Sequence, residues 1–260
     1  MWPVRERPVR ERLVRGGLLA CRPTTRLGAH NQETPMQIGI LQTGHAPDAL
    51  RAAHGDYPDM FVRLLEGHGL EFRTWPVLDM AFPPSVHAAE GWLITGSRFG
   101  AYEDHAFIHP LEEFIRQAHA EGVPLVGICF GHQIIAQALG GRVEKFAGGW
   151  SVGPRDYWIE DRDYRLNAWH QDQVVVPPAG AETVGSTPGC AHAALIYGDR
   201  AFTVQPHPEF APAFERGLIE ERGPGVVPED ALAEARARLD LPTDSAAMAG
   251  RIARFFTERR

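Results

Sequence analysis

The sequence predicts an α/β fold with a mostly parallel sheet, flanking helices and a small antiparallel section. From Met36 onward, short apolar runs alternate with helical patterns, which is typical of parallel strands joined by crossover helices. After Gly141 the strand-like runs become short and closely spaced, and this spacing indicates antiparallel pairing. Because 44% of the 260 residues are apolar, the chain can bury a full core, and we expect one domain over residues 36–260.

The first half of this domain contains the parallel strands and the helices between them. Apolar runs bounded by turn residues predict the strands, and apolar residues three to four apart predict the helices. Glycines occur where these helices should end, at Gly67, Gly69, Gly122 and Gly140. We expect strands over residues 37–42, 70–75, 91–95 and 124–128, and helices over residues 59–66, 107–120 and 132–139.

The second half begins with the antiparallel section and ends with helices. We expect the closely spaced strands over residues 151–160, 173–176, 182–186, 193–197 and 202–205. From Glu209 helical patterns return, with Pro, Gly and acidic breaks at residues 223–230 and 239–244. Apolar side chains near the C-terminus predict that the last helix docks on the core, namely Ile252, Ala253, Phe255 and Phe256.

Residues 1–35 differ from the rest of the chain. They contain the sequence Pro-Val-Arg-Glu-Arg twice and show no sustained apolar period. They hold seven arginines against three acidic residues, whereas the remainder carries a net charge of −11. We expect this segment to be a largely disordered extension, or to lie upstream of the true start at Met36. N-terminal sequencing of the native protein would decide between the two.

Composition and charge narrow the function classes. The acidic body argues against nucleic acid as a partner. No apolar run approaches the roughly 20 residues that span a membrane, so we expect no membrane partner. The three cysteines, Cys21, Cys129 and Cys190, are too few for a disulfide framework, and a cytoplasmic location is expected. Because the sequence has no nucleotide or metal motif, we expect no cofactor.

One cysteine lies where a strand should turn into a helix. The segment Gly127-Ile128-Cys129-Phe130-Gly131-His132-Gln133 follows an apolar run and opens an amphipathic one. Glycines on both sides of a nucleophile allow the strained turn that holds its side chain out from a sheet. At a helix N-terminus, the helix dipole and free N–H groups favour a thiolate. The pattern predicts that Cys129 is a nucleophile.

A base and an orienting acid follow a later strand. Gln205-Pro206-His207-Pro208-Glu209 comes after the apolar residues 201–204, and it completes a Cys-His-Glu set with Cys129. One alternative is that Cys129 is a buried structural cysteine, and another is that His207 is structural and Glu209 a helix-terminal charge. A third is a zinc site of Cys129, His132 and His207, but the spacing lacks a second Cys or His pair. Cys21 and Cys190 have no base motif nearby, so we interpret them as structural.

In the order of its motifs, the chain resembles the class I glutamine amidotransferases, a family with a flavodoxin-like fold. Thr95-Gly96-Ser97 occupies the position of the family's oxyanion loop, and the Cys129 segment and the His207 segment follow in the family's order. Between them, residues 169–174 resemble the His-x-Asp-x-Val segment in the glutaminase half of GMP synthase. For His170 and Asp172 a solvated turn is the default interpretation, and the resemblance adds a structural or gating role.

The resemblance implies roles for six residues. Cys129 would attack the γ-amide carbonyl of glutamine, His207 would transfer the proton to the leaving ammonia, and Glu209 would orient His207. The N–H groups of Phe130 and Gly96 would stabilise the oxyanion, and Gln133 would contact the α-amino acid part of the substrate. The loop Thr95-Gly96-Ser97-Arg98-Phe99-Gly100 departs from the Gly-Gly-Pro or Gly-Pro-Gly loop of many members.

We therefore expect a glutamine amidotransferase-type cysteine hydrolase with a small-molecule substrate and a γ-glutamyl thioester intermediate. Only about 50 residues follow Glu209, without a pyrophosphatase loop, so we expect a stand-alone domain rather than a complete GMP synthase. Ammonia would then pass to a separate synthetase subunit. One alternative is a γ-glutamyl peptidase that cleaves γ-glutamyl compounds, and another is a non-catalytic regulatory subunit that retains the fold.

Overall fold

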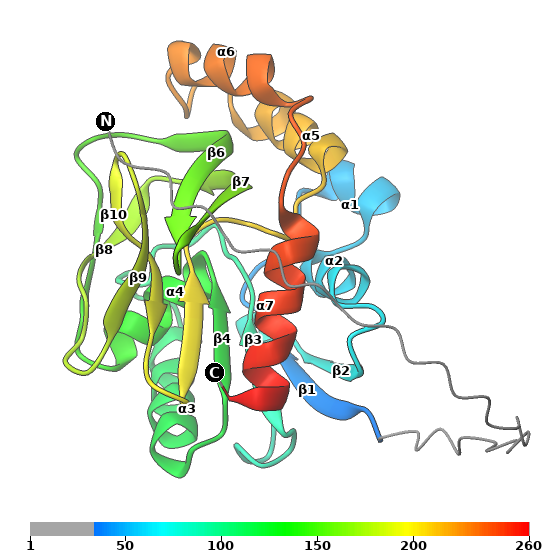
Figure 1. Cartoon of the computed structure of the whole chain (residues 1–260), viewed down its shortest axis with the longest axis vertical. Coiled ribbons are helices and arrows are strands. Elements are labelled where there is room, and N and C mark those ends of the chain that lie inside the picture. Colours follow the sequence, from blue (N-terminus) through cyan, green and yellow to red (C-terminus); the bar gives the residue numbers. More distant parts are fainter. Residues whose placement is uncertain (1–33, 260) are drawn as a thin grey trace, which may run out of the picture. The chain divides into compact units, whose positions relative to one another are not determined.

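The computed structural model describes residues 34–259, which contain a nine-stranded sheet with helices on both faces (Figure 1). The expectation for residues 1–35 concerns a segment that lies outside the described residues, apart from its last two. The strand order is β2-β1-β3-β4-β11-β10-β9-β6-β7. The predicted α/β class, with a parallel sheet and an antiparallel section, is confirmed.

The parallel part of the sheet contains five strands. Consecutive pairs are parallel from β2 to β11, and the predicted positions of the first four are confirmed within one residue at each end. The strands are β2 (Leu70–Trp75), β1 (Met36–Leu41), β3 (Gly91–Ile94), β4 (Leu125–Ile128) and β11 (Ala201–Val204).

The antiparallel part extends the sheet from β11. It contains β10 (Cys190–Ile196), β9 (Glu182–Thr187), β6 (Ser151–Ile159) and β7 (Arg162–His170). A separate two-stranded sheet pairs β5 (Arg142–Lys145) with β8 (Asp172–Val176). The prediction missed β5 and β7. It placed β11 in the antiparallel section, and β11 does pair antiparallel with β10, but it also pairs in parallel with β4.

Two helices cover each face of the parallel strands. α3 (Ile108–Glu121) and α4 (Phe130–Ala138) pack on one face, and α2 (Tyr57–Leu64) and α7 (Ser245–Glu258) pack on the other. Gly122 ends α3 in the left-handed conformation, with a φ of 76°, as the sequence predicted. The short helices α1 (Asp48–His54) and η1 (Val77–Asp79) lie in the loops after β1 and β2 and were not predicted.

The alternation of side chains along the strands divides the core into two clusters. Ile38 and Ile40 of β1 face α2 and α7, whereas Leu41 faces the side of α3 and α4. On β3, Trp92 is fully buried on the α3 side, where its ring contacts Phe114 edge to face at 4.9 Å between centroids. This double coverage explains why the parallel strands appear in the sequence as continuous apolar runs.

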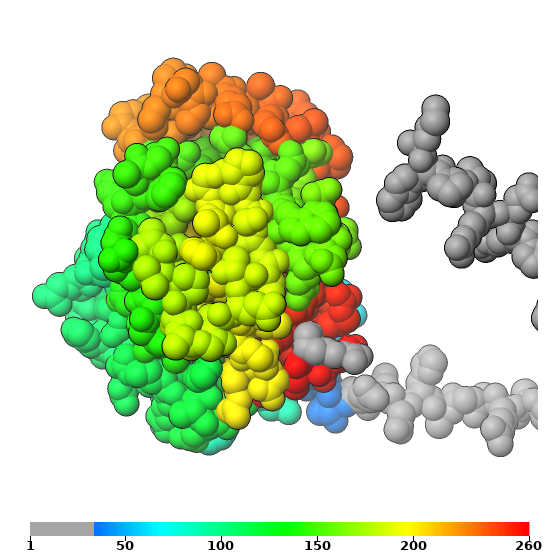
Figure 2. Space-filling view, turned by 60° about the vertical axis from the view of Figure 1, so that its left-hand side comes forward, coloured from blue at the N-terminus to red at the C-terminus, as the bar shows by residue number. Residues whose placement is uncertain are grey.

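The helices α5 (Pro212–Arg222) and α6 (Glu229–Arg238) pack at one end of the antiparallel section. In Figure 2 the yellow β9–β10 segment occupies the middle of one face, and the orange helical segment lies along its upper end. α6 approaches β6 so closely that a Cβ on Gly153, with a φ of 74°, would lie 2.7 Å from Ala235 Cβ. Within residues 34–259, no helix has the length and apolar character needed to cross a membrane.

Candidate active site

Cys129 lies between β4 and α4 in a strained backbone conformation. Its φ of 54° and ψ of −101° are rare for any residue with a side chain. The flanking glycines were predicted to adopt the strained turn themselves, but neither Gly127 nor Gly131 has a positive φ. They are required for another reason. A Cβ on Gly127 would lie 2.5 Å from the Gly131 carbonyl, and one on Gly131 would lie 2.3 Å from Ile94 O. The glycines let α4 approach the sheet, and the strain falls on Cys129 itself.

His207 and Glu209 lie together in the loop after β11. His207 Nδ1 is 2.7 Å from Glu209 Oε1, and both residues are buried. Because Glu209 occupies Nδ1, the Nε2 atom of His207 remains for another partner. The ring of His207 stacks on Phe210 at 3.9 Å between centroids, with 5° between the planes. Its orientation is therefore fixed by one polar contact and one apolar contact.

Asn167 of β7 holds this loop in place. The His207 N–H donates to Asn167 O at 2.8 Å, and Asn167 Nδ2 donates to Phe210 O at 2.7 Å. Asn167 is only 1% exposed, so loss of either bond would leave a buried polar group without a partner. Asn167 was not predicted as a site residue, because no strand was expected at residues 162–170.

The charges around His207 favour its protonated form. Burial acts to lower the pKa of His207, but the Cys129 thiolate and the Glu209 carboxylate outweigh burial and hold this pKa well above its usual value. A thiolate beside an imidazolium is the resting state of many cysteine hydrolases. Such a pair supplies a nucleophile and a proton for a leaving amine.

Gly96 lies against both His207 and Cys129. A Cβ on Gly96 would lie 2.9 Å from His207 Cε1 and 3.9 Å from Cys129 Cβ, so any side chain there would displace the histidine. Within residues 34–259 the Gly96 N–H donates no hydrogen bond. The Phe130 N–H belongs to the first turn of α4, where N–H groups lack intrahelical partners. Both predicted oxyanion donors therefore flank Cys129.

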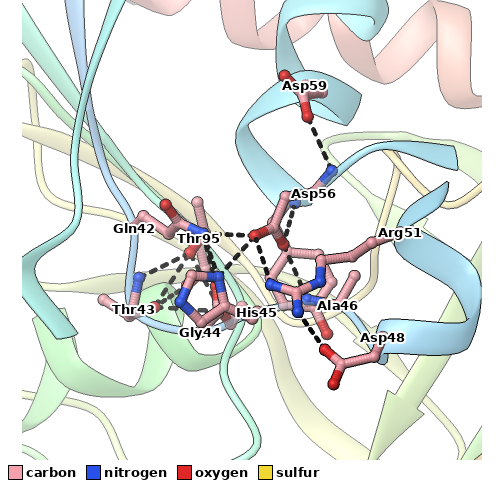
Figure 3. A network of polar contacts seen from close by, with 12 residues as sticks. Gln42, Thr43, Gly44, His45, Ala46, Asp48, Arg51, Asp56, Asp59 and Thr95 are labelled. Carbon is pink, nitrogen blue, oxygen red and sulfur yellow. Dashed lines mark hydrogen bonds and ion pairs between the residues drawn. The ribbon is translucent and has the colours of Figure 1, made fainter. Parts of the chain in front are cut away.

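Two buried threonines fix the peptide groups around Gly96 (Figure 3). The Thr43 hydroxyl lies 3.0 Å from Thr95 O and 3.1 Å from Gly96 O. The Thr95 hydroxyl lies 3.1 Å from Gly96 O and accepts the Thr43 N–H at 3.0 Å. Both carbonyls are satisfied when each hydroxyl donates to one of them. Because peptide groups are trans, this arrangement directs the Gly96 N–H away from Thr43.

A second group of contacts holds the loop that carries Thr43. Asp56 accepts the Gln42 side-chain amide at 2.9 Å and the Ala46 N–H at 2.8 Å, and it lies 2.6 Å from His45 Nδ1 (Figure 3). Burial acts to raise the pKa of Asp56, but the contacts with the Ala46 N–H, His45 and the Tyr57 N–H lower it overall. As the N-cap of α2, Asp56 also accepts the Tyr57 N–H. The loop after β1 is thus attached to the start of α2.

A cavity of about 300 Å³ opens beside Cys129. Gln133 lines this cavity, and its Nε2 donates to Asp172 O at 2.8 Å and lies 3.2 Å from Gln205 Oε1. Tyr102 donates to Asp172 Oδ1 at 3.2 Å. The structure therefore brings five of the predicted residues, Cys129, His207, Glu209, Gly96 and Phe130, into one cluster, with Gln133 on the adjoining cavity wall.

His170 and Asp172 do not lie on a solvated turn, and that default interpretation was wrong. His170 ends β7 and is 4% exposed, and Asp172 begins β8 and is half-buried. Burial and the nearby charge of His207 lower the pKa of His170 to about 3, so its imidazole is neutral. Neither ring nitrogen of His170 has a hydrogen-bond partner in the described part of the chain.

A buried glutamate lies near the histidine loop without contacting it directly. Glu215 of α5 accepts the Gly153 N–H at 3.0 Å and is fully buried. Burial raises the pKa of Glu215 to about 8, although the charge of His207 acts to lower it. Glu215 is therefore largely protonated at neutral pH.

His132, the additional histidine of the alternative zinc site, and Cys190, interpreted as structural, are both buried. His132 is fully buried and its Nδ1 lies 2.8 Å from Thr203 Oγ1. In the range 34–259, no group of three or more His, Cys, Asp and Glu side chains has the arrangement of a metal site. Cys190 is buried at the start of β10, and Cys21 lies outside the described residues.

Comparisons with known proteins find a family model and several relatives that are similar to this chain. Residues 99–221 match the family model described as glutamine amidotransferase class-I. A glutamine amidotransferase-like protein of Schizosaccharomyces pombe is 28% identical over 247 residues, which cover 85% of this chain and 98% of that protein. Gamma-glutamyl peptidase 2 of Arabidopsis thaliana is 27% identical over 188 residues, covering 67% and 76%.

The chain is also similar to part of a larger enzyme and to a solved structure. The GMP synthase of Aeropyrum pernix is 31% identical over 167 residues, covering 60% of this chain and 31% of that enzyme. A glutamine amido transferase structure from Methylobacillus flagellatus shares the fold with a TM-score of 0.65 and 21% identity, covering 87% of this chain and 93% of that one. Residues 99–221 thus resemble a class I glutamine amidotransferase domain, and the chain shares the fold of that solved structure.

Proposed function

We propose that the protein hydrolyses the γ-amide of glutamine through a γ-glutamyl thioester on Cys129. The observation that carries this proposal is the contact between His207 and Glu209 beside the strained elbow at Cys129. A nucleophile, a base and a third group that orients the base are the components of acyl transfer by a cysteine hydrolase.

The reaction would proceed through two tetrahedral intermediates. The Cys129 thiolate attacks the γ-carbonyl carbon, and the oxyanion accepts hydrogen bonds from the Gly96 and Phe130 N–H groups. The His207 imidazolium gives its proton to the leaving nitrogen, ammonia departs, and the thioester remains. Water then attacks the thioester and gives a proton to His207, and collapse of the second intermediate releases glutamate and restores the thiolate. Glu209 keeps Nε2 of His207 directed at the reacting atoms.

The α-amino acid end of the substrate would bind at the Gln133 side of the cavity. The Gln133 amide, the Asp172 carboxylate and the Lys145 ammonium line that side, and together they offer partners for an ammonium and a carboxylate. Orientation by these groups would place the γ-carbonyl at Cys129.

A γ-glutamyl peptidase is the second candidate, because a relative with that name matches two thirds of the chain. The thioester chemistry would be the same, but an amine of a peptide would leave instead of ammonia. For the first candidate, released ammonia requires an acceptor, and the similarity to GMP synthase favours a separate synthetase subunit as the partner.

The test is glutamate release by the purified chain from L-glutamine and, in parallel, from a γ-glutamyl dipeptide. Cys129→Ala should abolish release, whereas Cys190→Ala, which alters a buried cysteine outside the cavity, should retain it. Faster release from glutamine supports the amidotransferase, and faster release from the dipeptide supports the peptidase. Release from neither substrate would contradict both and favour a regulatory subunit.

A further inference from the structure

The cavity beside Cys129 has two walls with different chemistry. On one side, Asp172 contacts the other lining residues. Its main-chain carbonyl accepts a hydrogen bond from Gln133, its carboxylate accepts one from Tyr102, and it is opposite Lys145 in the β5–β8 sheet. This wall holds both signs of charge, which suits an amino acid zwitterion. A substrate that filled only this side would be glutamine, because its leaving group is ammonia.

The opposite wall is aromatic and cationic. Trp150 and Trp169 lie 6.0 Å apart between ring centroids and pack against the apolar cluster under α5 and α6. Arg222, at the end of α5, lines the cavity beside them, and Arg98 lines it from the loop after β3. The Arg98 guanidinium lies over the Phe99 ring at 4.9 Å from its centroid, and neither arginine forms an ion pair or a hydrogen bond with any residue of 34–259. Two guanidinium groups therefore remain available to an anion.

These arginines also border a second cavity. Arg98, Phe99 and Arg222 line both the Cys129 cavity and a neighbouring cavity of about 250 Å³. The far side of the second cavity is formed by the loop after β1, where Arg51 and His45 lie (Figure 3). The two cavities therefore share a wall of three residues, and each is larger than an ammonia molecule requires.

His170 adds a buried, neutral polar group to the lining on this side. It adjoins Trp169 and lines the Cys129 cavity, it is more than nine-tenths buried, and neither of its ring nitrogens has a partner in the part of the chain that the structure describes. Buried polar groups in native proteins are nearly always satisfied. A neutral imidazole offers one donor and one acceptor to a bound molecule.

We infer that Arg98 and Arg222 bind a carboxylate on the leaving group, which favours the second candidate function, with γ-glutamyl conjugates of amino acids or short peptides as the substrates. This inference rests on the proposed function, since the bond cleaved is the same γ-amide. The amine that departs from the first tetrahedral intermediate, as the thioester forms, takes its proton from His207 and carries its own carboxylate, which the two guanidinium groups hold. Charge-assisted hydrogen bonds of this kind distinguish an anion from a neutral group of the same size.

The test uses two substrates that differ only in this charge. γ-Glutamylglycine ends its leaving group in a carboxylate, whereas γ-glutamylethylamide ends it in a methyl group. The native protein should favour the glycine conjugate at least about ten-fold in kcat/KM, and the Arg98→Gln/Arg222→Gln double variant should lose most of that preference. Arg216→Gln is the matched control, because Arg216 also lies on α5 but pairs with Asp240 on the surface and lines neither cavity. It should keep the preference.

Two results would overturn the inference. Equal kcat/KM values of the native protein for the two substrates would show that no side chain recognises the carboxylate. An equal loss for both substrates in the double variant would instead assign the arginines to the α-carboxylate of the glutamyl group. Calorimetry on Cys129→Ala measures the same preference as a ratio of dissociation constants without turnover. If no substrate is hydrolysed, the proposed function fails, and the calorimetric ratio still decides whether the carboxylate site exists.

Discussion

Replacement of Thr43 by valine should impair hydrolysis without altering the nucleophile. Valine has nearly the shape of threonine but lacks the hydroxyl, so the buried carbonyls of Thr95 and Gly96 would share one donor instead of two. One carbonyl would then be buried without a partner. The peptide that carries the Gly96 N–H would lose the contact that fixes its direction.

The magnitude follows from these contacts. An unsatisfied buried carbonyl costs roughly 2 kcal/mol, which in a domain of this size lowers the unfolding midpoint by roughly 4 to 8 °C. Removal of one oxyanion donor in other enzymes costs about 10²- to 10³-fold in kcat. Since Thr43→Val would misdirect a donor rather than remove it, we expect a decrease of about 10- to 100-fold.

The assay compares two reactions of Cys129. Glutamate release requires an oxyanion, whereas alkylation by iodoacetamide displaces iodide and requires none. Thr43→Val should slow release and leave the alkylation rate within about two-fold of the native value, and Thr43→Ser, which keeps the hydroxyl, should restore release. Parallel losses in both reactions would show that Thr43 supports the position of Cys129 rather than the oxyanion donors, and unchanged release would refute the reasoning altogether.

Three further predictions concern the same site. Gly96→Ala should reduce glutamate release by at least about 100-fold, because its methyl group would displace His207; a near-native rate would contradict the contact. Asn167→Ala should lower the free energy of unfolding by roughly 1 to 3 kcal/mol, measured in urea, because Phe210 O loses its donor. Glu215 binds its proton more tightly when folded, so stability should fall as pH rises from about 4.5 to about 8; Glu215→Gln should flatten that slope in urea titrations, and an equal slope would assign it to other groups.

The sequence predicted the parallel strands well because both faces of these strands are covered. β3 and β4 are buried at every position, so they appear as uninterrupted apolar runs. β7 was missed because its nine residues mix exposed charges at the start with a buried asparagine and histidine near the end, and this mixture has no clear period. α1 has no buried residue, so its sequence lacks an apolar face.

The candidate site was predictable where chemistry is tied to a motif. Cys129, His207 and Glu209 could be located because each follows a predicted strand and lies within a short sequence motif, residues 127–133 or residues 205–209. Thr43 and Asn167 could not, because each acts on a backbone carbonyl of a residue more than 40 positions away. Any residue can supply a carbonyl, so the acceptor leaves no signal in the sequence, and a hydroxyl or amide donor alone does not indicate its partner.

The pairing of β4 with β11 connects these parts into one site. Both strands are parallel, Ile128 is opposite Val204, and the Cys129 N–H donates to Val204 O at 2.9 Å. The loop with His207 therefore begins at the same edge of the sheet as the elbow, where parallel strands place their carboxyl ends. β11 also pairs in antiparallel fashion with β10, so it joins the part of the sheet that carries Cys129 to the part whose strand β7 holds the His207 loop. A change that shifts the register of β11 should separate Cys129 from His207 even though every motif residue is retained.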